Sequence, residues 1–157
     1  MIIFALRNWS CVMKELRNSQ RWLERLSVYN QALRRLSDVV ALSSKRKLNE
    51  FERDSLIKRF EFTFEMGWKL MMSYEKENGI VQILGSRDVV RQAVSMALVD
   101  NGEAWMDMID ARNRTAHLYD EDAVVDIVDD IIYTYSPLLL ELQSTMENIK
   151  NQLLCTD

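Results

Sequence analysis

The sequence has few of the residues that interrupt regular structure, with four glycines and one proline among 157 residues. Turn-rich sandwiches, collagen-like repeats and disordered linkers all need more of these residues, so the composition argues against them. Two cysteines, Cys11 and Cys155, and a single histidine are too few for a disulfide framework or a Cys/His zinc cluster. We interpret both cysteines as reduced cytosolic thiols.

Long apolar runs are absent as well. The first residues, Met1–Arg7, are apolar but lack the leading basic segment and the length of a signal peptide. No uncharged stretch approaches the roughly 18 to 20 residues that a membrane span requires. We therefore expect a cytoplasmic protein without a membrane partner.

What remains is a chain of helical segments. A chain of this length buries roughly 70% of its extended surface, which suits one domain with its own core. We assign that domain to residues 14–157 and leave residues 1–13 as an N-terminal extension, because the helical pattern becomes regular only after Met13. Apolar residues recur at helical spacings in five segments: Lys14–Leu42, a segment from the cap Asn49 to the stop Gly79, Ser86–Val99, Glu103–His117 and Glu121–Leu153.

Several residues mark how these helices end and pack. Asn49 and Ser86 are expected N-caps, and Gly79 is expected to end its helix in the left-handed conformation. Gly67 lies on an apolar stripe, where it lets another helix approach closely, and Pro137 is expected to kink the last helix. The fold class is therefore all-α, an up-and-down bundle of four or five helices.

Charge is unevenly distributed along the chain. The total is -4, but residues 1–47 carry a net charge of +7 and residues 48–157 a net charge of -11. This asymmetry favours a basic face for an anionic ligand or partner, supplied by the first helix through Arg17, Arg21, Arg25, Arg34 and Arg35. The alternative is a set of ordinary solvated helix faces whose charges pair with each other.

Most catalytic patterns are missing. The one glycine followed by serine, Gly85, is not part of a phosphate-binding loop, and no serine or cysteine has a plausible triad around it. Residues 120–122 form an acidic triplet that could bind a divalent ion. Acids that open a helix are more simply explained by the helix dipole, so we expect no metal and no cofactor.

One segment, residues 110–120, combines the single histidine with arginines, an amide and a phenol. Asn113 and His117 are four residues apart and would share a helix face, toward which the long side chain of Arg112 can swing. A histidine can move a proton on or off a ribose hydroxyl, and a guanidinium can hold a phosphate in two places. These groups suit phosphodiester cleavage. The alternative is a cationic helix end that complements the C-terminal dipole.

Two stretches carry a resemblance to a known family. Phe60–Leu70 resembles the signature helix of the nucleotidyltransferase substrate-binding proteins, which belong to the HEPN superfamily of small helical bundles. Trp105–Asn113 with His117–Asp120 resembles the second signature of that family, the Arg-x4-His motif with a tyrosine two places after the histidine. Tyr135–Leu138 matches a recurrent feature of its last helix.

The resemblance implies a HepT-like toxin of a HEPN/minimal-nucleotidyltransferase toxin–antitoxin module. In such a homodimer two motifs meet in a cleft and cleave RNA without metal. Arg112 would bind the phosphate, His117 would transfer the proton and Asn113 would position them. Arg114, with Arg17, Arg21 and Arg25 of the first helix, would contact RNA or the partner.

The implied partner is a separate nucleotidyltransferase antitoxin, since the Gly-Ser turn and metal-binding aspartates of that enzyme are absent from this sequence. By resemblance, the partner silences the toxin, in some systems by attaching AMP to the tyrosine of the motif, here Tyr119. A second interpretation stays open, in which the chain is a non-catalytic subunit that presents substrate to the nucleotidyltransferase.

Overall fold

The computed structural model describes the backbone of residues 2–117 and 120–155, and the side chains of residues 21–117, 120 and 122–155. These residues form helices without any strand, so the all-α prediction is confirmed: α1 Ile2–Ser43, α2 Glu50–Glu77, α3 Ser86–Ser95, α4 Gly102–Arg114, a 3-10 turn Thr115–His117, α5 Glu121–Asp130, a π-helical segment Ile131–Tyr135 and α6 Ser136–Leu154. None of the helices in the described ranges is both long and apolar enough to cross a membrane.

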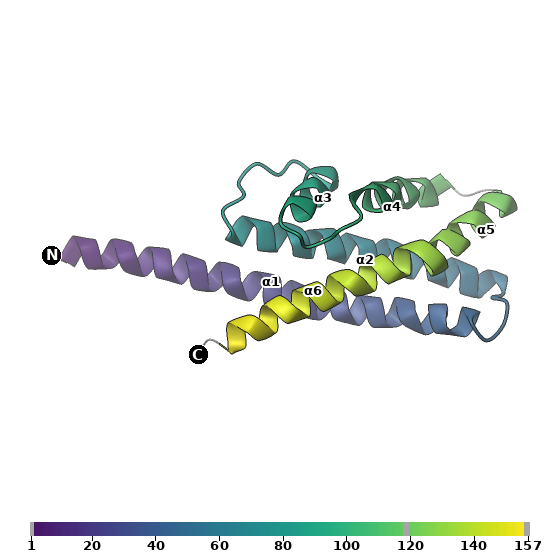
Figure 1. Ribbon diagram of the computed structural model, residues 1–157, viewed down its shortest axis with the longest axis horizontal. Coiled ribbons are helices and arrows are strands. Elements are labelled where there is room, and N and C mark those ends of the chain that lie inside the picture. Colours follow the sequence, from purple (N-terminus) through teal and green to yellow (C-terminus); the bar gives the residue numbers. More distant parts are fainter. Residues whose placement is uncertain (1, 118–119, 156–157) are drawn as a thin grey trace.

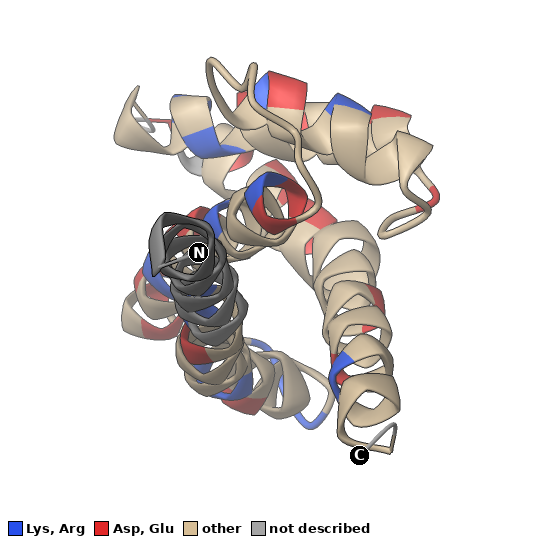
Figure 2. Cartoon of the chain, turned by 90° about the vertical axis from the view of Figure 1, so that its left-hand side faces the viewer, with Lys and Arg blue, Asp and Glu red and all other residues tan. Residues whose placement is uncertain are grey.

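The bundle is built on an antiparallel pair formed by α1 and α2 (Figure 1). α5, the π-helical segment and α6 form one continuous run that lies across this pair, while α3 and α4 lie on α2. Viewed along the bundle, basic and acidic residues are interspersed along the described helices (Figure 2).

The ends of α2 follow the sequence signals. The side chain of Asn49 accepts a hydrogen bond from the backbone of Glu52, whose own carboxylate accepts one from the backbone of Asn49, so the two form a capping box. Arg46 holds the same carboxylate, with 2.6 Å between Nη2 and Oε1. At the other end, Gly79 has a φ of +88°, the left-handed conformation that glycine adopts without steric cost.

Three predicted helix ends were wrong. α1 begins at Ile2 instead of Lys14, so the helical backbone includes the segment that the sequence pattern sets apart as an extension. The N-cap of α3 is Gly85, and Ser86 is the first helical residue. α3 also stops at Ser95, because Ala97 takes a φ of +55° and turns the chain before Val99.

The predicted kink at Pro137 takes another form. The helix widens before the proline, and residues 131–135 form a π-helical turn in which the backbone N–H of Ser136 donates to the carbonyl of Ile131. Proline has no N–H, so the carbonyls of the preceding turn cannot all find α-helical partners. α6 begins directly after the π turn, and Pro137 lies in the first turn of α6.

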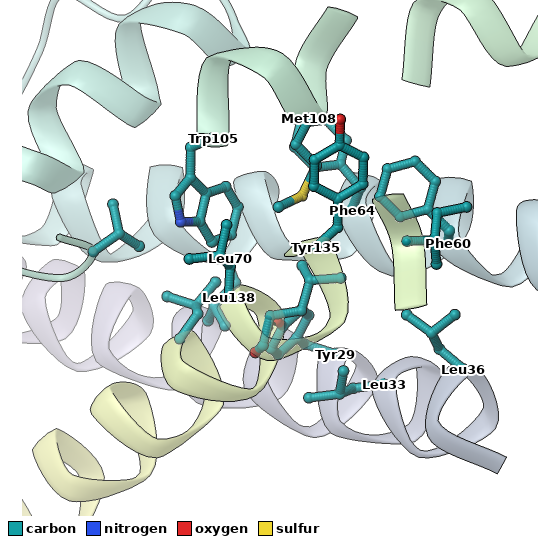
Figure 3. Close-up of a cluster of buried hydrophobic side chains, with 14 of the residues drawn as sticks. Tyr29, Leu33, Leu36, Phe60, Phe64, Leu70, Trp105, Met108, Tyr135 and Leu138 are labelled. Carbon is teal, nitrogen blue, oxygen red and sulfur yellow. Dashed lines mark hydrogen bonds between the residues drawn. The ribbon is translucent and has the colours of Figure 1, made fainter. Parts of the chain in front are cut away.

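The core is aromatic where α2, α4 and α6 meet. Phe60 stacks on Tyr135 with ring centroids 5.4 Å apart, and Phe64 packs against Trp105 at 6.4 Å. Figure 3 shows these rings along α2, with Trp105 reaching in from α4 and Met108 beside Phe64 and Tyr135. These signature-helix aromatics are therefore buried in the core of one chain.

Tyr29 of α1 joins three helices. Its ring lies 3.1 Å from the position that a Cβ atom on Gly67 of α2 would occupy, so the glycine allows the close approach that the sequence predicts. Its hydroxyl donates a 2.6 Å hydrogen bond to the carbonyl of Leu139 in α6. The hydroxyl therefore holds the ring against α2.

Glu75 is an exception within this apolar core. Its side chain is fully buried, and neither carboxylate oxygen has a hydrogen-bond partner within the described part of the chain. Burial without a cation raises the pKa of Glu75 to about 8. The carboxyl group is therefore neutral at neutral pH, when the unfolded chain would ionise it.

Replacement of Gly67 by valine tests the helix approach. We expect Gly67→Val to lower the free energy of unfolding by about 1 to 3 kcal/mol, because Tyr29 cannot move away without losing its hydrogen bond. Urea unfolding at fixed protein concentration measures the change. Gly85→Ser, where no atom lies within 4 Å of the added carbon and serine suits the N-cap position, is the control and should not lower stability. Equal stability of Gly67→Val and wild type would contradict the packing.

Replacement of Glu75 by glutamine tests the buried carboxyl. Since the pKa is raised in the folded state, wild-type stability should fall as pH rises from about 4.5 to about 8. Glu75→Gln should equal wild type near pH 4 and exceed it by more than about 1 kcal/mol at pH 8. Urea unfolding across this range measures both proteins. Glu24→Gln, at an exposed position of α1, is the control and should follow the wild-type pH curve.

Candidate functional site

The motif lies at the C-terminal end of α4. Trp105 and Met108 are buried, and Trp105 packs against Phe64 of α2, which fixes the helix on its neighbour. Beyond them Arg112 is half-buried, while Asn113 and His117 are exposed. One half of the motif is thus held by the bundle, and the other half faces solvent.

Arg112 is directed toward α2. Its charge interacts with both Glu61 and Glu65, which lie one helical turn apart. Its Nε atom is shielded from solvent and has no hydrogen-bond acceptor among the residues that the structure describes. An unsatisfied buried guanidinium nitrogen is costly, and an anion bound beside it would supply the missing acceptor.

Thr115 links the end of α4 to α2. Its hydroxyl contacts a carboxylate oxygen of Glu61 and lies 2.6 Å from the carbonyl oxygen of Arg112. Burial opposes ionisation of Glu61, but its contacts with Lys58 and Thr115 outweigh this effect, and the pKa of Glu61 is lowered. The carboxylate therefore remains charged and anchors the turn that follows Arg112.

A groove of about 630 Å³ runs between α1 and α2 and reaches Arg112. Its lining is rich in cations, with two acids and one exposed aromatic residue: Ala32, Arg35, Ser55, Lys58, Arg59, Glu61, Phe62, Glu65 and Arg112. The two acids are already paired within α2. Glu61 lies 2.7 Å from Lys58, and Glu65 lies 2.9 Å from Lys69.

Arg59 is the groove arginine that the sequence interpretation missed, whereas Arg35 is one of the first-helix arginines expected to form a basic face. Arg59 donates a hydrogen bond to the backbone carbonyl of Arg35, which places the two side by side across the α1–α2 pair. Neither guanidinium forms an ion pair with another described residue. The register of the antiparallel pair brings them together, and periodicity alone does not reveal that register.

The first-helix arginines predicted to contact RNA or the partner, Arg21 and Arg25, do not line this groove. Arg21 is exposed, Arg25 is half-buried, and the side chain of Arg17 lies outside the described residues. Arg21 is fourteen residues before Arg35 in the same helix, which corresponds to about 21 Å along its axis. Within the described part of α1, the arginine close to the motif is therefore Arg35.

Arg114 lies on a different side of α4 from Arg112. It lines a separate hollow of about 480 Å³ with Asp126, Asp129 and Asp130 of α5. This acidic surrounding attracts the arginine and repels phosphate groups. The structure therefore separates the predicted contact Arg114 from the groove that Arg112 lines.

Asn113 and His117 are not related by a regular α-helical repeat. α4 ends at Arg114, and Thr115–His117 form a 3-10 turn, which rotates by about 120° per residue instead of about 100°. Both side chains are exposed, but the shared face that we inferred from their spacing is lost. Tyr119, the predicted modification site, lies outside the described residues.

The acidic triplet that follows behaves as a helix start. The side chain of Asp120 accepts from the backbone N–H of Asp122 at 3.4 Å and is the N-cap of α5. No group of histidine, cysteine or acidic residues that could hold a metal ion occurs among the described residues. The interpretation of these acids as a dipole-favoured N-terminus thus fits the structure.

The chain matches the family described as nucleotidyltransferase substrate binding protein like over residues 24–148. A Haemophilus influenzae protein named probable ribonuclease HepT is 29% identical, over 75% of this chain and 91% of that protein. The crystal structure of a Thermus thermophilus protein is 27% identical with a TM-score of 0.67, over 74% of this chain and 96% of the other. A tri-AMPylated HEPN toxin from Shewanella oneidensis, solved in complex with MNT antitoxin, shares the fold at 19% identity and a TM-score of 0.59, over 83% and 96%.

Proposed function

Because the chain belongs to the nucleotidyltransferase substrate binding protein like family, we propose that it is a HEPN-type toxin that cleaves RNA without metal. A separate nucleotidyltransferase antitoxin would inhibit the toxin. The placement of Arg112 carries this proposal. Its shielded Nε atom lacks an acceptor, it lies at the end of a groove that contains further arginines, and the next helical turn presents the histidine to solvent.

The reaction uses the 2'-hydroxyl of the substrate as nucleophile. This oxygen attacks the neighbouring phosphorus, the bond to the 5'-oxygen of the next nucleotide breaks, and a 2',3'-cyclic phosphate and a 5'-hydroxyl result. His117 removes the proton of the 2'-hydroxyl. In a homodimer, His117 of the second copy returns a proton to the leaving 5'-oxygen. Arg112 stabilises the charge that develops on the phosphate oxygens, and Asn113 orients the reacting groups.

A second function remains a candidate because the family is described by substrate binding and because the groove also contains Glu61 and Glu65. In that case the chain would bind a nucleotide or an RNA end and present it to the nucleotidyltransferase, and no bond would be cleaved by Arg112 and His117. The two functions differ in one observable, cleavage by the purified chain alone.

The first prediction concerns the chemistry of the motif. Purified wild-type protein should cleave a mixed RNA in excess EDTA and leave cyclic phosphate ends, whereas His117→Ala should not. Arg112→Lys keeps a cation beside Glu61 and Glu65 but loses the planar fork, and its rate should fall about 100-fold or more. Gel analysis of end-labelled RNA measures both. Absence of cleavage by folded, unmodified wild type would favour the substrate-binding subunit.

The second prediction concerns regulation. After co-expression with its nucleotidyltransferase, the chain should gain the mass of one or more AMP groups, and the modified protein should not cleave RNA. Tyr119→Phe should prevent the addition, because it removes the hydroxyl that accepts the nucleotide. Intact mass spectrometry measures the addition, with the singly expressed chain as control. Unchanged mass in an active co-expression would rule out silencing by modification.

A further inference from the structure

Beyond the motif, three arginines from three helices line one groove. Arg35 comes from α1, Arg59 from α2 and Arg112 from α4. Arg35 and Arg59 form no ion pair within the described part of the chain, whereas the charge of Arg112 also interacts with Glu61 and Glu65. These acids of the groove are paired with Lys58 and Lys69. Arg35 and Arg59 therefore bring to the groove two guanidinium groups that have no carboxylate partner.

The same groove carries an exposed aromatic ring. Phe62 is 51% exposed although it belongs to the signature helix, whose other phenylalanines, Phe60 and Phe64, are buried. Phe51 is 82% exposed and lies eleven residues earlier, about three helical turns and 16 Å along the same face of α2. Ser55, Lys58 and Arg59 lie between these two exposed phenylalanines. This face of α2 therefore carries basic groups between aromatic ones.

We propose that the groove between α1 and α2 binds a single strand of RNA that leads to the scissile phosphate. Arg35 and Arg59 hold phosphates next to the one that Arg112 binds, and a base stacks on the ring of Phe62. This inference rests on the proposed function and adds the binding surface that positions its substrate.

The chemistry of the lining favours a single strand over a duplex or a protein. Guanidinium groups bind phosphates in two places, and an aromatic ring stacks on a base of any identity. In a duplex the bases are already stacked and paired, so none could lie on Phe62. Glu61 and Glu65 are paired with Lys58 and Lys69, so they oppose a phosphate beside Arg112 less than unpaired carboxylates would.

The test measures binding without cleavage. In the His117→Ala background, a fluorescein-labelled single-stranded 12-mer of mixed sequence is titrated with protein, and anisotropy gives the Kd at several salt concentrations. Arg35→Gln should weaken binding about fivefold and reduce the salt slope by about one. Arg34→Gln removes the same charge from the neighbouring residue, which lines a different hollow against α6, and should change the Kd less than twofold.

Substitution of Phe62 separates stacking from a seam between two copies of the chain. Phe62→Leu should weaken RNA binding about tenfold because the π face is lost, while Phe62→Tyr should bind like the parent. Light scattering should give the same oligomeric state for all three. If Phe62→Leu binds normally, or if Phe62→Leu instead changes the oligomeric state, the stacking role is wrong.

The outcomes distinguish this inference from the proposed cleavage. RNA binding that depends on Arg35 and Phe62, in a chain whose wild type does not cleave, would support the groove and contradict the ribonuclease. Cleavage by wild type with an unchanged KM for Arg35→Gln and Phe62→Leu would support the ribonuclease and overturn the groove. Equal losses of RNA affinity in Arg34→Gln and Arg35→Gln would also overturn the groove, because net charge alone would then explain binding.

Discussion

The contact of Tyr29 with Gly67 and Leu139 determines how the three long helices are placed. The ring sets the distance between α1 and α2, and the hydroxyl ties α6 to the same point. Helices in contact along their whole length have few remaining degrees of freedom, so one close approach fixes the register of the pair. That register places Arg59 against the backbone of Arg35 and forms the groove that ends at Arg112.

Only one end of the motif is held by contacts with the helical bundle. α4 is held through Trp105 and Met108, and Thr115 attaches its last turn to Glu61. Arg112 is thus positioned by the core, whereas His117 lies on an exposed 3-10 turn. In the proposed function, Arg112 would bind phosphate from a rigid helix and His117 would transfer a proton from a less supported turn. Such a site would be completed when a second protein chain or a substrate is present.

Much of the fold follows from local signals that act within a few residues. Asn49, Gly79 and the apolar stripes are sufficient to place α2, because capping and left-handed turns depend on neighbouring backbone groups. The missed features depend on distant contacts. The burial of Glu75 and the pairing of Arg35 with Arg59 arise only when α1 and α2 are brought together.

The motif itself shows the same division. Its residue types are visible in the sequence, and their resemblance to the family agrees with the match over residues 24–148. Spacing did not predict that Arg112 and Arg114 would line different hollows, because the surroundings of each come from α2 and α5. Nor did it predict the change from α-helix to 3-10 turn after Arg114.

The π-helical segment at residues 131–135 has a consequence for how the gene can vary. The π-helical turn contains one residue more than an α-helical turn. It therefore determines how α6 is rotated about its axis relative to α5, which packs on α2, while α6 also packs on α1. If the same residues formed a regular α-helix instead, all of Ser136–Leu154 would rotate by about 100° relative to α5. Leu138, Leu139 and Leu142 would then leave the core together. A one-codon deletion within this turn would remove the extra residue and restore a regular helix, so the face of α6 that packs in the core would be nearly unchanged.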